Sequence, residues 1–329
     1  MKKEFPEIGN VGKVILTVLV DNKADLIVES KENIKYFTDK PLLAEHGFSV
    51  LIQIDDTGER FLWDAGVSEN SLVENMHRME LDIHAIAKIA LSHGHSDHYA
   101  GVTALLKEMS LIPQAKEWGE RVSREEVEQW TTESQLPIVS HPAAYRERWW
   151  KKKDGTLVGP LAATPGKEWE AAGAKIITSS KPYKLHAGCW TTGYVPRKSF
   201  EKSGRPTNLF YREGSEFLKD DLEEDQAIVI NVRDKGLIVL SGCAHSGIVN
   251  IIEHAKNFTG IEKLYAIMGG FHLARAKDEE ISETIEYIKK QRPVYVAPSH
   301  CSGLPAISRF AREMPEAFVE GVVGISYIL

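Results

Sequence analysis

Short apolar runs recur along the chain and alternate with polar, turn-forming sequence. Runs of about four to eight residues that are rich in Val and Ile are typical of buried β-strands. The predicted strands are 14–20, 48–54, 61–63, 86–91, 227–232, 237–240, 264–267 and 294–297. Two neighbouring pairs of these strands, one in each half of the chain, are separated only by turn sequence and therefore predict β-hairpins.

Longer segments between these strands carry apolar residues at intervals of about three or four, the spacing of an amphipathic helix. Such helices are predicted at 68–84, 102–109, 248–257 and 282–291. Ser282 opens the last of them and is a favourable N-cap residue. Two halves that are both rich in strands and both followed by helices predict an α/β fold, a sandwich of two mixed sheets with the helices outside.

The range 111–194 differs from the rest, because it shows little alternation of apolar and polar residues. Most of the tryptophans lie in it: Trp118, Trp130, Trp149, Trp150, Trp169 and Trp190. We therefore expect a single domain over 1–329 with an insertion or cap at about 111–194. The aromatic side chains of this cap either wall a substrate pocket or form a small core of their own.

Composition excludes several classes of protein. The hydrophobic and charged fractions, 43% and 26%, are those of an ordinary globular chain. A net charge of -7 argues against generic nucleic-acid binding. No apolar run reaches the roughly 20 residues of a membrane span, and no apolar segment follows the basic N-terminus, so we expect neither membrane insertion nor export. Three widely spaced cysteines indicate a reducing, cytoplasmic setting, while homo-oligomer formation is left open.

Four side chains that can bind metal follow directly on the predicted strand 86–91. They are His93, His95, Asp97 and His98. Because the backbone can turn sharply where a strand ends, these side chains can converge on one volume. Neutral imidazole and ionised carboxylate are ligands that zinc accepts. The pattern therefore predicts a metal site and not a surface cluster of histidines.

This motif is similar to the signature of the metallo-β-lactamase superfamily, and residues 61–66 resemble the strand-Asp-x-Gly element that precedes it. One branch of the superfamily is named after the methanopterin-pathway enzyme 7,8-dihydropterin-6-yl-methyl-4-(β-D-ribofuranosyl)aminobenzene 5'-phosphate synthase. The chain resembles that branch at residues 192–197, 240–247, 268–273 and 298–303. The resemblance spans most of the chain and implies an αββα sandwich.

The resemblance also implies a set of metal ligands. One ion would be held by His93, His95 and His245, and a second by Asp97, His98 and His300. His272 is a further candidate, either as a ligand or as an acid–base group of the pocket, and the choice between it and His300 as final ligand stays open. Asp97 would also act in catalysis by orienting the attacking water.

Other residues are expected around these ligands. Asp64 follows the strand 61–63, where a buried carboxylate would accept an imidazole N–H and fix the tautomer of a ligand. The resemblance implies that Asp21 and Asn22 lie near the site, although a plain turn after a strand is an equal interpretation. For His46 we favour a hydrogen-bonded loop histidine over a pocket residue.

Cys243 departs from the superfamily pattern. Many members have an aspartate at this position that bridges two metals, so the bridge and full dinuclear occupancy are in question here. A thiolate can ligate zinc, but a small buried side chain is the commoner role of cysteine, and we favour packing beside the metal site.

Arg197 is the candidate substrate ligand, because its guanidinium can bind a phosphate or carboxylate through two hydrogen bonds; a surface arginine is the alternative.

Together these features predict a metal-dependent hydrolase that uses a metal-activated water on a small, phosphorylated or pterin-like substrate. The expected cofactor is zinc, as one or two ions, with manganese and iron as alternatives. A nucleotide phosphodiesterase is the second hypothesis, and a catalytically weak, metal-bound ligand sensor is the third. The residues do not identify the substrate itself, because one fold supports many reactions.

Overall fold

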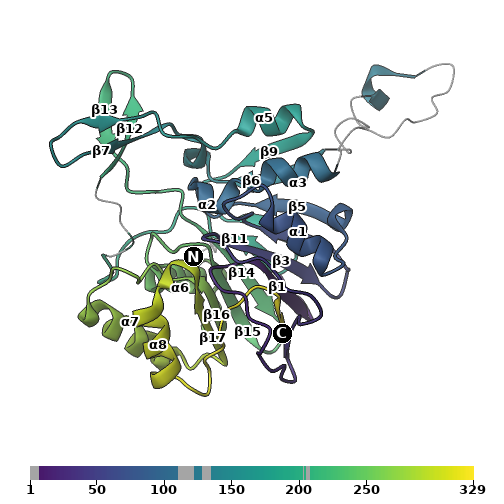
Figure 1. Ribbon diagram of the computed structural model, residues 1–329, viewed down its shortest axis with the longest axis vertical. Helices are drawn as coiled ribbons and strands as arrows, with labels where there is room; N and C mark the ends of the chain where they lie inside the picture. Colours follow the sequence, from purple (N-terminus) through teal and green to yellow (C-terminus); the bar gives the residue numbers. More distant parts are fainter. Residues whose placement is uncertain (1–6, 110–121, 128–134, 203, 205–207) are drawn as a thin grey trace.

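A computed structural model describes residues 7–109, 122–127, 135–202, 204 and 208–329 (Figure 1). Trp118 and Trp130 of the predicted cap lie outside these residues. Within the described part of the chain, no helix is both long enough and apolar enough to cross a lipid bilayer.

The first of the two central sheets has eight strands and is mixed. In spatial order they are β2 (Ile34–Tyr36), β18 (Ile325–Ile328), β1 (Val14–Val20), β3 (Ser49–Ile54), β4 (Arg60–Trp63), β5 (Ile86–Ala90), β6 (Leu136–Ser140) and β9 (Ala174–Thr178). Strands β3 and β4 form the N-terminal hairpin expected from the sequence. From β4 onward the neighbours are parallel, so β4, β5 and β6 all end at one edge of the sheet.

The second central sheet has six strands. Their order is β10 (Tyr183–His186), β11 (Cys189–Thr191), β14 (Ala227–Val232), β15 (Gly236–Ser241), β16 (Leu264–Gly270) and β17 (Tyr295–Ser299). Strands β14 and β15 form the second expected hairpin. Strands β15, β16 and β17 are parallel, and they deliver their following loops to a common edge.

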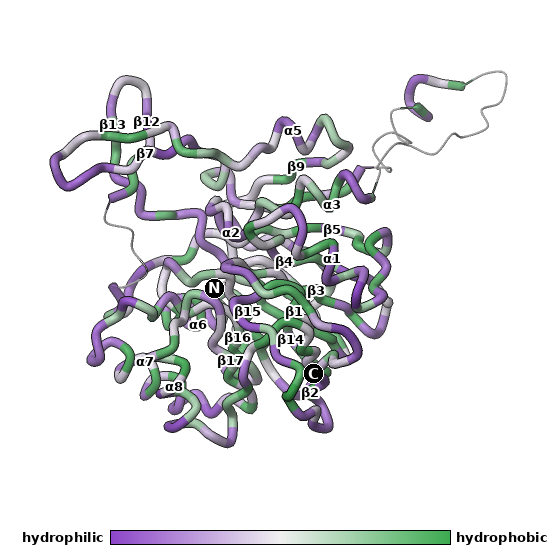
Figure 2. The backbone as a smooth tube through the Cα atoms, in the orientation of Figure 1, coloured by the Kyte–Doolittle hydropathy of each residue, from purple (hydrophilic) through white to green (hydrophobic). Residues whose placement is uncertain are grey.

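The two sheets pack face to face, with helices on both outer surfaces (Figure 1). The core between the sheets joins side chains such as Leu16 and Phe61 of the first sheet to Ile230 and Leu240 of the second. The strands at this centre are the most apolar part of the chain (Figure 2). The helices are α1 (Ser71–Arg78), α2 (Ser96–Tyr99), α3 (Val102–Met109), α5 (Gly166–Ala171), α6 (Ile248–Thr259), α7 (Asp278–Gln291) and α8 (Leu304–Glu313). This is the αββα sandwich that the sequence predicted.

The range 111–194, which we expected to be an insertion or cap, contributes strands to the central sheets where the structure describes it. Strands β6 and β9 complete the first sheet, and β10 and β11 complete the second. A small third sheet projects from the sandwich (Figure 1) and combines β7 (Arg148–Lys151) and β8 (Leu157–Val158) with β12 (Leu209–Glu213) and β13 (Glu216–Lys219). The apparent lack of alternation in this range arises because the central strands here are short and the small sheet takes its strands from two distant segments.

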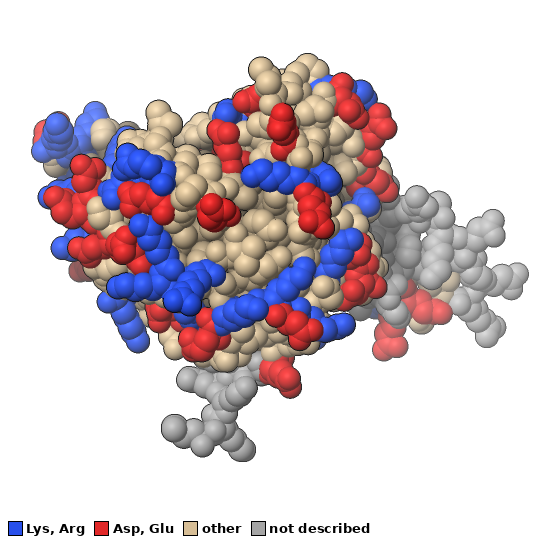
Figure 3. Space-filling view, turned by 90° about the horizontal axis from the view of Figure 1, so that it is seen from below, with Lys and Arg blue, Asp and Glu red and all other residues tan. Residues whose placement is uncertain are grey.

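Charged side chains of both signs surround an uncharged central region on the face shown in Figure 3. Two predicted helices have wrong boundaries. The helix predicted at 68–84 is α1, which ends at Arg78. The helix predicted at 282–291 is α7, which begins at Asp278, so Ser282 lies inside it. The hydroxyl of Ser282 donates to the carbonyl oxygen of Asp278, one turn earlier, and so does not act as an N-cap. Three acidic residues in the first turn of α7 favour its N-terminus instead, because the helix dipole is positive there.

Candidate metal centre

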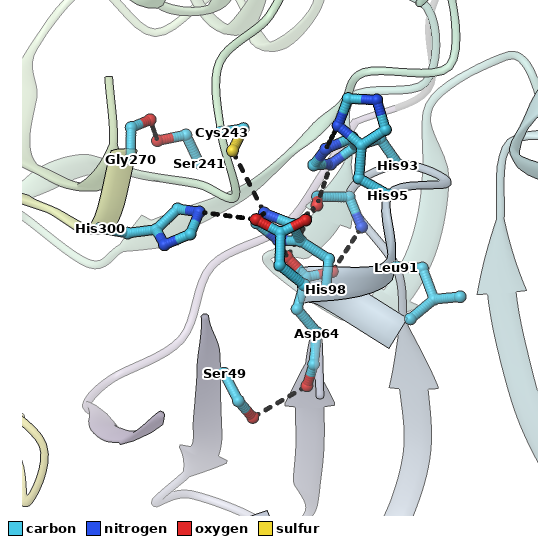
Figure 4. Close-up of polar contacts among 12 residues, drawn as sticks. Ser49, Asp64, Leu91, His93, His95, His98, Ser241, Cys243, Gly270 and His300 are labelled. Carbon is cyan, nitrogen blue, oxygen red and sulfur yellow. Dashed lines mark hydrogen bonds and ion pairs between the residues drawn. The ribbon is translucent and has the colours of Figure 1, made fainter. Parts of the chain in front are cut away.

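Loops that leave both sheets at the same edge form a compact cluster of metal-binding side chains (Figure 4). Asp64 follows β4, His93 and His95 follow β5, and Asp97 and His98 lie in α2. The loops after β15, β16 and β17 supply the remaining members, which are Cys243, His245, His272 and His300. The parallel direction of these strands brings together residues that are far apart in sequence.

The first donor group consists of His93, His95 and His245, whose ligand atoms all lie within 4.8 Å of one another. His93 Nε2 lies 3.0 Å from His95 Nδ1. The Nδ1 of His245 donates to the carbonyl oxygen of Gly204 over 2.7 Å, which leaves Nε2 as the free nitrogen. That Nε2 is buried and has no hydrogen-bond partner among the described residues.

The second donor group consists of Asp97, His98, Cys243 and His300. Asp97 Oδ2 lies 3.4 Å from His300 Nε2 and 3.6 Å from His98 Nε2. Cys243 Sγ lies 3.2 Å from the same His98 nitrogen. Ligands about 2.0–2.3 Å from a tetrahedral zinc ion are themselves separated by roughly 3.4 Å. The donors therefore have the spacing that a zinc-sized ion requires.

His272 belongs to a third, overlapping group with Cys243 and His245. Its ring centroid lies 4.2 Å from that of His245, and its Nδ1 is buried without a hydrogen bond among the described residues. His272 and His300 both have positive φ angles, 49° and 48°, as does Ala244 with 57°. Such backbone strain costs of order 1–3 kcal/mol per residue and clusters at functional sites.

Asp64 makes the contact that the sequence predicted for it. Its Oδ2 accepts from His98 Nδ1 and from the Ser92 hydroxyl, and its Oδ1 accepts from the backbone N–H of Ser92, each over 2.7 Å. The tautomer of His98 is thereby set, with Nε2 directed at the second donor group. Gly242 is required beside them, because a Cβ there would lie 2.2 Å from Ser92 Oγ and 2.7 Å from Asp64 Oδ2.

The electrostatics of the cluster favour a bound cation. Burial, together with the nearby His98 and His95 rings, holds the pKa of His93 well below its usual range, and burial lowers that of His95 to about 4. Burial also disfavours the charged form of His98, but the carboxylates of Asp97 and Asp64 outweigh it and raise the pKa of His98 to about 9. The neutral imidazoles of His93 and His95 beside the ionised carboxylate of Asp97 are fitting donors for a divalent ion, and an ion bound at His98 would displace the proton of that ring.

Two further loops, which carry His46 and the pair Asp21 and Asn22, complete the rim of this centre. His46, which we expected to be an ordinary loop residue, lies at the mouth: its side chain is 69% exposed, and Nε2 is 3.5 Å from Asp97 Oδ2. Asn22 Oδ1 lies 3.3 Å from His300 Nδ1, and Asp21 Oδ1 accepts from the backbone N–H of His300. Asp21 and Asn22 are therefore near the site, as the resemblance implied, and they orient His300.

Arg148 is a buried residue beside the centre that sequence reasoning did not find. Its guanidinium forms ion pairs with Asp220, over 2.7 Å, and with Glu224. It also lies under the metal-binding loop, since a Cβ on Gly94 would be 2.9 Å from Arg148 Nη1. No local pattern marks this residue, because its acidic partners lie 72 and 76 positions away in the sequence.

Arg197 does not occupy the position expected of a substrate ligand. Its Nη2 donates to the backbone carbonyl oxygens of Asp221 and Leu222, the latter over 2.9 Å. The guanidinium thus holds the loop that precedes β14. This arrangement does not support the predicted role in binding a phosphate or carboxylate.

Comparison with known proteins identifies the family of the chain. Residues 43–256 match the model of the metallo-beta-lactamase superfamily. The chain belongs to this superfamily. It is 30% identical over 301 residues to 7,8-dihydropterin-6-methyl-4-(beta-D-ribofuranosyl)-aminobenzene-5'-phosphate synthase from Methanocaldococcus jannaschii, an alignment that covers 87% of this chain and 94% of the relative. Both the superfamily and the branch predicted from the sequence are therefore confirmed.

Two further proteins extend this picture of the superfamily. An uncharacterized protein from the same organism is 28% identical over 285 residues, again with 87% of this chain and 94% of the relative covered. The crystal structure of Tm1679, a metal-dependent hydrolase of the β-lactamase superfamily, superimposes with a TM-score of 0.69 at 21% identity. That superposition covers 95% of this chain and 98% of Tm1679, so the metallo-β-lactamase fold accounts for nearly the whole chain.

Proposed function

We propose that this protein is a metal-dependent hydrolase that holds two divalent ions, preferentially zinc, and acts on a small molecule carrying a phosphate group. One observation carries the proposal: two groups of donor atoms, each compact enough to hold one metal ion, lie next to each other, and the His98 ring of one is 4.3 Å from the His93 ring of the other. His93, His95 and His245 would hold one ion, and Asp97, His98 and His300 the other. The nitrogen, oxygen and sulfur donors favour zinc over magnesium or calcium.

Divalent ions bound at this centre supply Lewis-acid polarisation of a phosphoryl or carbonyl oxygen and acidify water. The chain itself supplies an ionised carboxylate and a rim. Burial opposes ionisation of Asp97, but His98 and His300 lower the pKa of its carboxyl well below the ordinary value, so it stays ionised and can accept a hydrogen bond that orients an attacking water. His46 lies on the solvent side of Asp97, where it can donate a hydrogen bond to a leaving group.

The name of one relative supports a substrate that carries a phosphate group. The protein that is 30% identical is named as the synthase of a pterin-bearing ribofuranosyl phosphate. We therefore propose a substrate of that kind, with an aromatic head and a phosphorylated ribose. Because the relative is named as a synthase and not as a hydrolase, the reaction type and the substrate class need separate tests.

The test is turnover by protein loaded with zinc, with manganese or with iron(II). The substrates are p-nitrophenyl phosphate, bis-p-nitrophenyl phosphate, p-nitrophenyl acetate, a lactone and a synthetic dihydropterin ribose phosphate. We expect hydrolysis of the phosphate substrates, and we expect His95→Ala and Asp97→Ala to lower both metal content and turnover by orders of magnitude. His77→Ala is the matched control, because His77 is an exposed histidine of α1 that pairs with Glu108.

Each alternative has its own outcome in this experiment. Cleavage of the diester with none of the monoester would favour a nucleotide phosphodiesterase. Cleavage of the acetate or lactone alone would refute the phosphate substrate and retain the hydrolase. Full metal occupancy without turnover on any substrate, together with saturable binding of the pterin compound, would favour a ligand sensor.

A further inference from the structure

We propose that Cys243 is a metal ligand shared by both ion positions, in the place where many superfamily members have a bridging aspartate. This inference rests on the proposed metal centre and concerns how it is built. It also reverses the packing role that the residue type favoured.

The position of the sulfur atom carries the inference. Cys243 Sγ belongs to the donor group of Asp97, His98 and His300, and also to the group of His245 and His272. Within each group every ligand atom lies within 4.8 Å of every other. Apart from Cys243, these two groups have no member in common, and His245 also belongs to the first donor group with His93 and His95, so the sulfur lies beside a proposed ligand of each ion.

The surroundings of the sulfur are those of a ligand and not of a packing atom. His98 Nε2 lies 3.2 Å from it, and that nitrogen is already directed into the centre by Asp64 (Figure 4). The Nε2 atoms of His245 and His300, both on side chains more than nine-tenths buried, make no hydrogen bond among the described residues and belong to the same groups. The thiol therefore lies among side chains proposed to ligate the ions and not among apolar side chains.

Cys189 shows what a packing cysteine looks like in this chain. It lies on β11, pairs in register with Ile230 of β14, and belongs to the apolar core between the two sheets. Both cysteines are buried, Cys189 completely and Cys243 with 3% exposure. The difference between them is therefore in the chemistry of their neighbours and not in the degree of burial.

The backbone after β15 is shaped to present this thiol. Ala244 adopts a left-handed conformation, with φ of 57°, between Cys243 and His245. The N–H of Gly270 donates to the carbonyl oxygen of Gly242, and the Cys301 thiol donates to that of Cys243 over 3.4 Å. These contacts hold the turn that sends Cys243 and His245 into the centre together. A left-handed alanine is disfavoured unless the surroundings impose it.

A shared thiolate has a chemical consequence. Sulfur is a soft ligand, so it selects zinc or cobalt over manganese and magnesium, whereas a bridging carboxylate suits the harder ions. A ligating thiol must release its proton, so binding of the ions is accompanied by proton release to solvent. We therefore expect this chain to prefer zinc more strongly than do superfamily members with the bridging aspartate.

The experiment is a titration of the metal-free full chain with cobalt(II), followed by absorption spectroscopy. A cobalt–thiolate bond gives an intense near-ultraviolet charge-transfer band that histidine and carboxylate ligands do not give. For a shared thiolate the band should grow through two equivalents of cobalt; a terminal thiolate would stop its growth at one. X-ray absorption of the zinc form should show sulfur at about 2.3 Å.

Three variants complete the design. Cys243→Ser should lose the band and at least one equivalent of metal, whereas Cys189→Ser and Cys301→Ser should retain both. Cys243→Asp should restore the metal content without the band and shift the preference toward manganese. If Cys243→Ser fails to fold, as judged by circular dichroism, a band that persists in both Cys189→Ser and Cys301→Ser still assigns the thiolate to Cys243.

Two kinds of failure are distinguishable. Two bound ions with neither a charge-transfer band nor a zinc–sulfur distance would overturn the ligand assignment, whatever the turnover. A band that persists in Cys243→Ser and vanishes in Cys301→Ser would overturn it in favour of the other thiol. Complete loading with the expected spectra but no hydrolysis would leave the shared thiolate standing and contradict the proposed function.

Discussion

Single hydrogen bonds decide which atom of each residue faces the metal centre. Asp64 accepts from His98 Nδ1, the Gly204 carbonyl accepts from His245 Nδ1, and Asn22 lies beside His300 Nδ1. In all three cases Nε2 is the nitrogen left for a ligand role. Partners of this kind orient the imidazole and raise its basicity, so they contribute to affinity without touching the ion.

The first prediction concerns Asp64. Asp64→Asn should lower the affinity for zinc by about 10–100-fold, because an amide is a weaker partner for the His98 N–H than a carboxylate is. Competition with a chromogenic chelator measures the affinity. Asp56→Asn is the control, since Asp56 is an exposed carboxylate that accepts from the N–H of Gly12, far from the donors. An affinity equal to that of the wild type would show that His98 needs no such partner.

The second prediction concerns His46. Its ring lies 5.0 Å from that of His300, on the exposed side of the centre. His46→Ala should lower kcat/KM for a phosphate substrate by about tenfold, the loss expected for one hydrogen bond to a charged group. Elemental analysis should find the metal content unchanged, and His77→Ala should behave as the wild type. A fall in metal content would mean that His46 is a ligand and not a substrate contact.

At the scale of elements, strand ends and helix starts place the donors, and α6 is the element closest to His245 in sequence. Its N-terminus is capped from outside by Glu201, whose carboxylate accepts from the backbone N–H groups of Val249 and Asn250. Gly247 is required at this point, because a Cβ there would lie 2.2 Å from Glu201 Oε2. The loop that carries Glu201 continues to Gly204, so one segment caps α6 and orients His245.

The third prediction is a pH dependence that originates in Glu201. Burial raises the pKa of this carboxyl from 4.5 to about 7, against the hydrogen bonds from Ser199 and the α6 backbone that lower it. The folded protein therefore holds a proton that the unfolded chain releases near pH 4.5. Stability should fall as pH rises through this window and level off above about pH 7, by up to about 3 kcal/mol.

Urea unfolding across this pH range tests the prediction. Glu201→Gln cannot ionise, so its free energy of unfolding should decline less with pH than that of the wild type; the part that remains is expected from Glu224, whose pKa burial also raises to about 7. Glu283→Gln, at an exposed position of α7, should keep the wild-type slope. A slope that is equal in Glu201→Gln and wild type would assign the pH dependence to another group.

At the scale of the whole molecule, the metal centre forms where the edges of two sheets meet, and the small third sheet is joined to this region through Arg148. That arginine begins β7 and reaches Asp220 and Glu224, in the chain segment between β13 and β14. It also donates to the carbonyl oxygen of Ala143. One buried cation thus connects the third sheet, the chain before β14 and the loop that holds His93 and His95.

The fourth prediction follows from this buried cation. Arg148→Met should lower the free energy of unfolding by about 3–5 kcal/mol, because two buried carboxylates lose their partner. Arg148→Met combined with Glu224→Gln should recover part of that loss. Arg146→Met is the control: its pair with Glu223 is partly exposed, and such pairs contribute about 0–1 kcal/mol. Equal losses in the two single variants, measured by chemical denaturation, would contradict a structural role for Arg148.

The sequence by itself determined the features that depend on neighbours along the chain. Both hairpins and most helices follow from apolar spacing, because a strand or helix buries one face with a fixed period. The motif from His93 to His98 was equally visible, since its side chains are delivered by one strand end and one short helix. The superfamily and the sandwich were therefore within reach of local patterns and motif resemblance.

Only the tertiary structure decided what depends on contacts between distant segments. Strands and loops that meet across the two sheets create the environment of Cys243 and the ion pairs of Arg148. They also place His46 at the mouth of the metal centre. The third sheet likewise pairs residues 148–150 with 209–211. Residue type and spacing carry no information on such pairings, because the register and packing of separate strands select them, and the same cysteine can lie in an apolar core or among ligands.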